Sequence, residues 1–224
     1  MENETDRRLE TIRTDYDGLA QEYAERLFDE LERKPLDCEV LRRFAARVGA
    51  RGSVCELGCG PGHVARFLHQ AGVKVSGLDL SPGMVEQARR LNPEIDFRVG
   101  NMLALDLADG AVEGIAAFYC IVNLAPELLP LVFAEMARVL TPGGLALLAF
   151  HMGNRAGDHA MHPGELWGNP VAMEFFFHST ADVEAMLGAA GFEIDERIER
   201  EPYAPEVEYQ TRRAYILARK TASQ

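Results

Sequence analysis

The sequence predicts an α/β fold: a Rossmann-like, doubly wound sheet that is mostly parallel, with an antiparallel last strand and an N-terminal helical cap. Three observations predict it. Short apolar segments alternate with helical segments from residue 53 onward, a glycine-rich turn follows the first apolar segment, and no helix separates the last two strand-like segments. The 224 residues are enough for one well-buried domain.

Two helical segments come first. Apolar residues recur every three or four positions over 10–33, and Pro35 ends this helix because proline cannot continue a helix interior. A second helix is predicted over 36–49. We therefore expect residues 1–50 to form a helical cap and residues 51–224 to form the alternating core.

The core segments follow one another with short connections. Ser81 and Pro82 are suited to begin a helix, and Gly72 to end one. The last strand has no helix before it, so we expect it to pair antiparallel with its neighbour. The predicted strands are 53–58, 73–80, 95–101, one beginning at 114, 145–151, 192–201 and 211–220. The predicted helices are 63–72, 81–91, 126–140 and 181–190, with a turn at 141–144 and a loop-like stretch at 152–178.

Gly58, Gly60 and Gly62 form a turn that is thin enough for a ligand to approach the backbone. The dinucleotide fingerprint GxGxxG needs a glycine where this chain has His63. Glu56, two residues ahead of the turn, would repel a pyrophosphate and attract an ammonium group. The charge therefore favours a ligand with an amino-acid head over NAD, although a tight turn that binds nothing also agrees with this motif alone.

Polar residues also follow the next two predicted strands. Asp79 ends the second strand, where a carboxylate can accept both hydroxyls of a ribose; its alternative role is to interact with the dipole of the next helix. Asn101 and Met102 end the third strand, where an amide suits an adenine edge and a thioether suits its face. The alternative for Asn101 is a turn cap. Taken together, these groups favour an adenosyl ligand.

The motifs ELGCGPG, LDLSPGMVEQAR, VGNM and LTPGG, in this order, resemble those of class I S-adenosylmethionine-dependent methyltransferases. TDYDGLAQEYAERL is similar to the cap helix of the small-molecule branch of that family, and the resemblance extends from about Tyr16 to Lys220. It implies methyl transfer to an oxygen or nitrogen of a small-molecule acceptor, with S-adenosylmethionine as cofactor and S-adenosylhomocysteine as product. The alternatives are an NAD-dependent oxidoreductase and a non-catalytic protein that binds S-adenosylmethionine.

The resemblance also implies a cofactor site. Tyr16 and Tyr23, seven residues apart, would share one helical face and fold over the cofactor, or pack in the core instead. The other implied contacts are Glu56, Gly58, Cys59, Gly60 and Gly62 with the methionine portion, Asp79 with the ribose, Leu80, Asn101 and Met102 with the adenine, and Phe118 and Tyr119 beside the methionine.

Methyl transfer is an in-line displacement that needs a base only when the acceptor must lose a proton. His151, which ends the fifth strand, is the candidate base; its alternative role is a hydrogen bond at the strand end. Asn123 and Tyr119 are weaker candidates for contact with the acceptor. The histidine that relatives often place near Asn123 is absent here.

Residues 152–178 are predicted to form an acceptor-pocket insertion. The segment is rich in aromatic residues, including Trp167 and Phe176, which suits a small organic acceptor; the alternative is that these rings seal the sheet edge. Arg212 is a candidate partner for an acceptor carboxylate, or else belongs to an ordinary surface ion pair.

The composition limits the expected partners. The formal net charge is -12, which disfavours nucleic acid. No apolar run approaches the roughly 20 residues of a membrane helix. The N-terminus has no apolar signal region and the four cysteines have no CxxC spacing, so we expect a cytoplasmic protein.

His159 and His162 are spaced as in some metal sites, but Pro163 opposes a helix there and no metal is expected. The oligomeric state and the acceptor stay open.

Overall fold

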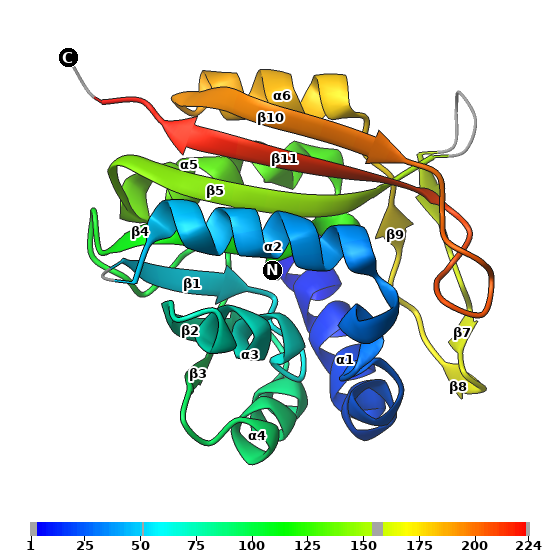
Figure 1. Cartoon of the computed structure of the whole chain (residues 1–224). Helices are drawn as coiled ribbons and strands as arrows, with labels where there is room; N and C mark the ends of the chain where they lie inside the picture. Colours follow the sequence, from blue (N-terminus) through cyan, green and yellow to red (C-terminus); the bar gives the residue numbers. More distant parts are fainter. Residues whose placement is uncertain (1–3, 51, 154–158, 223–224) are drawn as a thin grey trace.

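The computed structural model describes residues 4–50, 52–153 and 159–222. Residues 1–3, 51, 154–158 and 223–224 lie outside the described residues, and with them part of the predicted 152–178 insertion and the outer ends of both predicted domains. Within the described residues, the centre of the fold is a seven-stranded sheet ordered β3-β2-β1-β4-β5-β11-β10 (Figure 1). Only β11 runs antiparallel to its neighbours, which confirms the predicted fold class.

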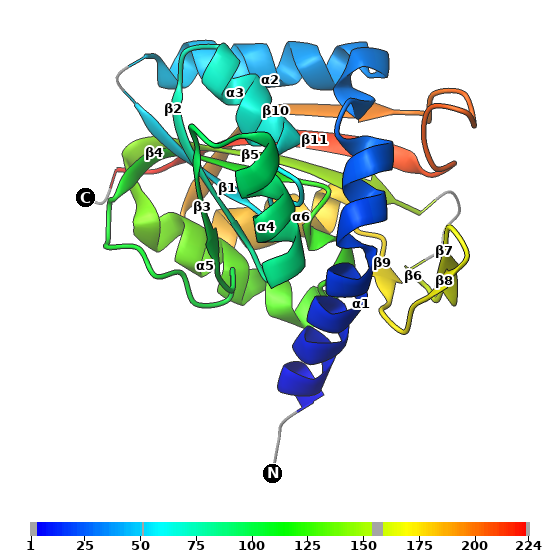
Figure 2. The same cartoon turned by 90° about the horizontal axis from the view of Figure 1, so that it is seen from below.

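Helices cover both faces of the sheet. α2, α3 and α4 pack on one face and α5 and α6 on the other, while α1 runs along the edge where the parallel strands end (Figure 2). The sheet strands are β1 (Ser53–Leu57), β2 (Lys74–Asp79), β3 (Asp96–Val99), β4 (Val112–Phe118), β5 (Leu140–Met152), β10 (Phe192–Arg200) and β11 (Arg212–Lys220). The helices are α1 (Glu4–Leu27), α2 (Pro35–Val48), α3 (His63–Gln70), α4 (Pro82–Leu91), α5 (Leu129–Val139) and α6 (Thr180–Ala189), with short 3-10 turns η1 (Glu30–Arg33), η2 (Ile121–Asn123) and η3 (Pro126–Leu128).

Local sequence signals explain where the core helices begin. The Ser81 hydroxyl accepts a hydrogen bond from the Met84 amide at 3.0 Å, and Pro82 takes the first helical position of α4. Ser179 caps α6 in the same way, through the Asp182 amide at 3.1 Å. The predicted helix start at Ser81 is therefore confirmed.

The N-terminal helices differ from the expectation in two respects. The predicted 10–33 helix is divided, because Arg66 of α3 donates to the Phe28 carbonyl at 3.0 Å and to Asp29, which turns the chain between α1 and η1. In addition, α2 buries Leu41 and Phe44 completely against the sheet. Part of the predicted cap thus contributes to the main core, and a domain boundary near residue 50 stays a prediction.

Two predicted boundaries in the centre of the sheet also shift. β4 ends at Phe118, because Tyr119 adopts a positive φ of 54° and η2 follows. The predicted turn at 141–144 lies inside β5. Leu140 pairs with Val112 and pairing resumes only at Leu145, so the four residues between form a bulge.

The described part of the predicted insertion contains two short hairpins instead of a loop alone. β6 (Ala160–Met161) pairs with β9 (Phe175–Phe176), and β7 (Glu165–Leu166) pairs with β8 (Asn169–Pro170). Trp167 and Gly168 join β7 to β8, both with positive φ.

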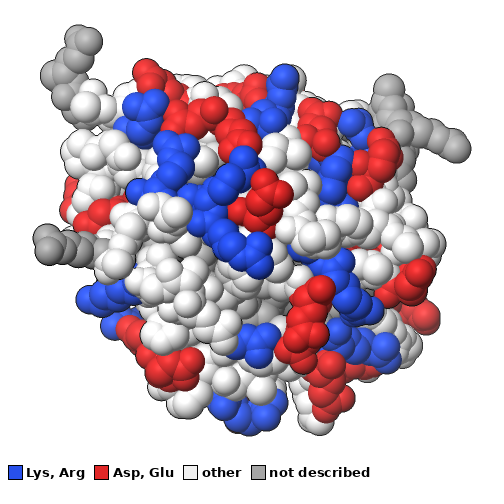
Figure 3. All heavy atoms as spheres, viewed as in Figure 1, with Lys and Arg blue, Asp and Glu red and all other residues white. Residues whose placement is uncertain are grey.

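The surface carries charges of both signs. On the face drawn in Figure 3, acidic and basic side chains are interspersed. Several belong to pairs such as Arg43–Glu196 at 2.8 Å and Arg219–Asp195 at 2.8 Å. Among the helices described, none has the length and apolar character to cross a membrane.

Candidate functional site

A cleft lies at the carboxyl ends of β1, β2, β3 and β4, beneath α1. Its empty volume, including the part open to solvent, is about 870 Å³. Among the predicted cofactor residues, those that line it are Tyr16, Tyr23, Glu56, Gly58, Cys59, Gly60, Asp79, Leu80, Asn101, Met102, Phe118 and Tyr119. Asn123, a predicted acceptor contact, also lines the cleft. The fold therefore brings together residues from four separate strand ends and one helix.

Glu56 is the most unusual group in the cleft. Its side chain is 2% exposed, and no hydrogen-bond partner for Oε2 exists within the described part of the chain. Burial, reinforced by the nearby Asp79 charge, raises the pKa of Glu56 well above its ordinary value, although the Ala65 backbone amide opposes this. A buried carboxyl with an unsatisfied oxygen is suited to receive a cationic hydrogen-bond donor.

Asp79 joins the glycine turn to the start of α4. Its Oδ2 accepts a hydrogen bond from the Gly60 amide at 2.8 Å, and its Oδ1 accepts one from the Ser81 amide at 2.9 Å. Burial raises the pKa of Asp79, and these amides partly offset the increase. The end of β2 thus holds this carboxylate in a fixed position on the cleft wall, as a ribose contact requires.

The glycines of the turn have different roles. Gly60 lines the cleft, and a Cβ there would meet only the Tyr23 ring, at 3.8 Å. Gly62 does not line the cleft. Its φ is 82°, and a Cβ would lie 2.7 Å from the Phe97 ring and 2.8 Å from the Asn92 amide. Gly62 is therefore needed for packing between the turn and the sheet.

The predicted adenine contacts form a wall beyond Asp79. Leu80 and Met102 present apolar side chains there, together with Met84 of α4. Asn101 Oδ1 accepts a hydrogen bond from the Leu103 amide at 2.9 Å. Asn101 thus makes the turn cap that the sequence left open as its alternative role, while it still lines the cleft.

α1 forms the cover of the cleft. The Tyr16 hydroxyl donates to Asn123 Oδ1 at 2.8 Å, and the Tyr16 and Tyr23 rings are 6.0 Å apart. Burial raises the pKa of both phenols, so they stay protonated. The Trp167 ring packs on Tyr23 with centroids 5.7 Å apart, but Trp167 itself does not line the cleft.

Two aspartates attach α1 to its surroundings. Asp17 Oδ1 accepts hydrogen bonds from the Ser81 hydroxyl at 2.6 Å and the Gly83 amide at 2.8 Å. Asp15 Oδ2 accepts from the amides of Ala172 and Met173 at 2.8 and 2.7 Å. The helix is therefore held on one side by α4 and on the other by the segment between β8 and β9.

His151 lies next to the cleft and not in its wall. Its Nδ1 is 2.8 Å from the Thr211 hydroxyl, which is the strand-end hydrogen bond considered as its alternative role, and its ring is 5.3 Å from that of Tyr119. Burial, and then the charges of Arg213 and Lys34, hold the pKa of His151 well below its ordinary value. The imidazole is neutral near pH 7.

The remaining predicted acceptor residues also lie outside the cleft wall. Phe176 pairs with Ala160 in the β6–β9 hairpin, and Arg212 forms ion pairs with Glu199 at 2.9 Å and Glu201 at 3.2 Å. No group of three or more potential metal ligands occurs among the residues that the structure describes.

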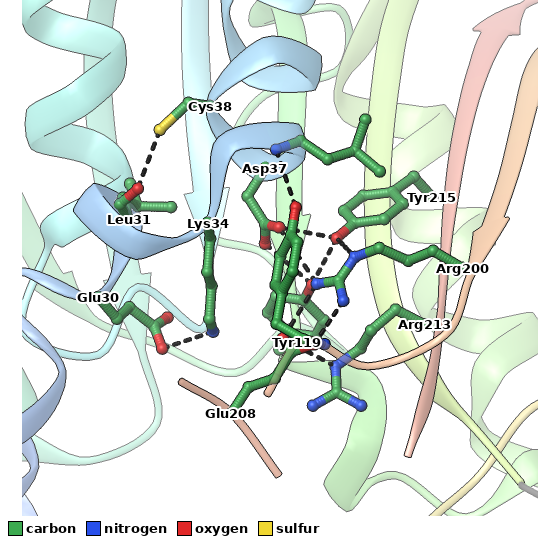
Figure 4. A network of polar contacts seen from close by, with 12 residues as sticks. Glu30, Leu31, Lys34, Asp37, Cys38, Tyr119, Arg200, Glu208, Arg213 and Tyr215 are labelled. Carbon is green, nitrogen blue, oxygen red and sulfur yellow. Dashed lines mark hydrogen bonds and ion pairs between the residues drawn. The ribbon is translucent and has the colours of Figure 1, made fainter. Parts of the chain in front are cut away.

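Sequence reasoning missed a polar network behind the cleft (Figure 4). The Tyr119 hydroxyl donates to Asp37 Oδ1 at 2.9 Å and lies 3.0 Å from the Tyr215 hydroxyl, and Arg200 contacts Tyr215 at 2.9 Å. These residues come from α2, from the position after β4, and from β10 and β11, so no sequence spacing connects them.

Two polar residues of the cleft wall, Glu30 and His63, were also missed. His63 was noted only because it replaces a glycine of the dinucleotide fingerprint. The i,i+4 spacing of Glu30 and Lys34 was the one local signal for this part of the wall.

Comparison with known proteins agrees with this geometry. Residues 54–144 match a family model described as a methyltransferase domain. A malonyl-[acyl-carrier protein] O-methyltransferase of Pectobacterium atrosepticum is 32% identical over 132 residues, covering 58% of this chain and 50% of the relative. A demethylmenaquinone methyltransferase of Beutenbergia cavernae is 34% identical over 109 residues, covering 49% and 44%. The chain spans about half the length of the curated relatives it matches.

Solved structures extend the likeness to the whole fold. A SAM-dependent methyltransferase of Methanosarcina mazei superposes with a TM-score of 0.71 over 78% of this chain and 95% of that one, at 16% identity. At that identity the likeness concerns the fold alone. Together with the family match, it shows a methyltransferase-like fold in which residues 54–144 are similar to a methyltransferase domain.

Proposed function

We propose that the protein transfers the methyl group of S-adenosylmethionine to an oxygen or nitrogen of a small-molecule acceptor and releases S-adenosylhomocysteine. The observation that carries the proposal is the buried Glu56 carboxyl, whose Oε2 has no partner in the described structure and borders the glycine turn. This oxygen suits the ammonium group of the cofactor, whereas it would repel the pyrophosphate of NAD.

The rest of the cofactor suits the remaining wall. Asp79 would accept hydrogen bonds from the ribose hydroxyls, and Leu80 and Met102 would pack on the adenine faces. The thin backbone at Gly60 would allow the methionine portion to approach, and Gly58, which packs on Cys120, would border it. The aromatic rings of the wall are attractive neighbours for a sulfonium. They are Tyr16, Tyr23, Phe118 and Tyr119.

The cofactor supplies the electrophilic methyl group, so the protein has to align the acceptor and exclude water. α1 covers the cleft, and Asn123 of η2 connects it to the segment before β9: Asn123 accepts a hydrogen bond from the Tyr16 hydroxyl and donates one to the Glu174 carbonyl. The malonyl-[acyl-carrier protein] relatives are named as O-methyltransferases, which supports an oxygen acceptor.

His151 is the proposed base for an acceptor that must lose a proton. Its neutral imidazole can accept one, and its ring lies against Tyr119, which lines the cleft. Without such an acceptor the same cleft would simply bind the cofactor, which is the non-catalytic alternative. A screen of metabolite acceptors that detects S-adenosylhomocysteine release separates the two.

Calorimetry tests the cofactor directly. The protein is expected to bind S-adenosylmethionine and S-adenosylhomocysteine and not NAD. Asp79→Asn should weaken S-adenosylhomocysteine binding by roughly 1–3 kcal/mol, because it removes the charge from hydrogen bonds to the ribose. Binding of NAD alone, or an unchanged affinity of the Asp79 variant, would contradict the proposal.

A further inference from the structure

Two polar side chains of the cleft wall, Glu30 and His63, form a row with the neighbouring Lys34. Glu30 Oε1 lies 3.2 Å from His63 Nε2, and Glu30 Oε2 accepts a hydrogen bond from Lys34 Nζ at 2.7 Å. The three side chains are 12%, 12% and 7% exposed, in the order Glu30, His63, Lys34. Figure 4 shows the Glu30–Lys34 pair next to Tyr119. We name these residues the Glu30–His63–Lys34 row.

The row is connected to the proposed cofactor position. Glu30 and His63 both line the cleft, together with Glu56 and Gly60. His63 begins α3 directly after the glycine turn, and Lys34 Nζ lies 5.4 Å from the centroid of the Tyr119 ring. The row therefore borders the methionine end of the cleft and not its adenine end.

One atom of the row is unsatisfied. His63 Nδ1 is buried and has no hydrogen-bond partner among the described residues. Its other ring nitrogen is already taken by Glu30, so only Nδ1 is available to a ligand. Buried polar atoms in native proteins normally have partners, and an exception next to an open cleft indicates a ligand contact.

The charges of the cleft indicate which ligand group this is. Burial opposes ionisation of Glu30, yet the His63 hydrogen bond and the Lys34 charge lower its pKa to about 2, so Glu30 is anionic. Glu30, Glu56 and Asp79 would together repel the carboxylate of an amino-acid head. Of the two basic side chains that Glu30 contacts, His63 lines the cleft, and a proton on its Nδ1 would be available to a carboxylate oxygen.

We propose that His63 Nδ1 binds the α-carboxylate of the cofactor, with Glu30 and Lys34 as the residues that position the imidazole. The proposal rests on the proposed function. The amino-acid head is then bound at two places: Glu56 binds the ammonium group, and His63 of the Glu30–His63–Lys34 row binds the carboxylate.

The test is calorimetric binding of S-adenosylhomocysteine and of its decarboxylated analogue. The wild-type protein should prefer S-adenosylhomocysteine by about tenfold or more, the scale of a charge-assisted hydrogen bond. His63→Leu should reduce this preference to less than about threefold while it leaves the affinity for the analogue unchanged. The exposed His69 of the same helix provides the matched control, and His69→Gln should keep the wild-type preference.

Two conservative variants separate ligand binding from a structural role. His63→Asn keeps an amide near the position of Nδ1, whereas His63→Gln keeps one near Nε2, on the Glu30 side. Carboxylate binding predicts that the Asn variant retains more of the preference. Retention by the Gln variant instead, or equal losses for both ligands in His63→Leu, would overturn the inference. If the wild-type protein failed to bind S-adenosylhomocysteine at all, the proposed function itself would be rejected.

Discussion

The two sides of the cleft are built in different ways. On the proposed cofactor side, Glu56 lies on β1 and Asp79 ends β2, and the Asp79 carboxylate accepts hydrogen bonds from amides at most 19 residues away. On the covering side, which α1 forms, the contacts join distant segments: the Tyr16 hydroxyl donates to Asn123 across 107 positions, and Asp15 accepts from the Met173 amide across 158. The first side is assembled by local motifs and the second by tertiary packing.

This difference explains which of the predicted site residues line the cleft. The ends of parallel strands meet at one sheet edge, so a motif at each end places its side chain in the cleft. No comparable rule places residues of the insertion such as Trp167 and Phe176, and both lie outside the cleft wall. Substitutions on the cofactor side should therefore mainly change ligand affinity, whereas substitutions on the covering side should mainly change the stability of the fold.

Glu56→Gln provides the strongest test of the cofactor side. It should weaken S-adenosylhomocysteine binding by about 3–5 kcal/mol, more than a hundredfold, because a buried ammonium group loses its counter-charge. The same substitution should stabilise the protein in the absence of ligand. Since the pKa of Glu56 is higher in the folded state, this carboxyl disfavours folding increasingly as pH rises above 4.5, its ordinary pKa.

Thermal melts of the protein without ligand test the predicted effect of Glu56→Gln on stability. Glu56→Gln should melt at a higher temperature than the wild type at pH 7, and the difference should vanish as pH falls below about 4.5. A variant that is less stable at pH 7, or that binds the cofactor normally, would mean that Glu56 has a structural role.

Two glycines of the same turn should differ in whether their substitution affects fold stability or ligand affinity. Gly62→Ala should destabilise the fold by about 2–3 kcal/mol, because it adds a left-handed alanine and a contact with Phe97 that is too short. Gly60→Ala adds the same kind of backbone strain, since Gly60 has a φ of 51°, but no short contact, so it should destabilise the fold less than Gly62→Ala and lower S-adenosylhomocysteine affinity more. Denaturant melts and calorimetry measure both, and a larger affinity loss for the Gly62 variant would reverse the assignment.

Tyr16→Phe tests the covering side, and its expected effect on stability is the smallest of these predictions. The substitution leaves Asn123 Oδ1 without the hydroxyl donor, which should cost about 0.5–1.5 kcal/mol of stability. S-adenosylhomocysteine affinity should stay within about threefold, since the Tyr16 ring is kept. Tyr209→Phe, at an exposed phenol, is the matched control and should change stability by less than about 0.5 kcal/mol. A tenfold loss of affinity in Tyr16→Phe would show that the hydroxyl belongs to the cofactor side.

Much of the fold could be predicted because its signals are local. The Ser81 cap, the apolar strand runs and the glycine turn each involve only a few neighbouring residues. The division of the first helix was missed, because the Arg66 side chain that takes the Phe28 carbonyl comes from 38 positions away. The bulge in β5 was read as a turn, since a glycine pair is compatible with both.

The site shows the same limit. His151 was selected because it ends a strand, yet its neighbours Thr211, Arg213 and Lys34 come from segments that only the folded chain brings together. The partners of Tyr119 are equally remote in sequence. A pattern can indicate that a side chain reaches the sheet edge, but not which charges surround it there.

The sequence by itself determined the alternation of strands and helices, the antiparallel last strand, the thin turn and the two carboxylates near it, because hydrophobic patterning and turn chemistry act over a few residues. Only the tertiary structure decided that Gly62 serves packing, that His63 lines the cleft and has a ring nitrogen without a partner among the described residues, and that His151 lies against Tyr119 outside the cleft wall. The physical reason is that burial and electrostatic environment depend on contacts between residues far apart in the chain.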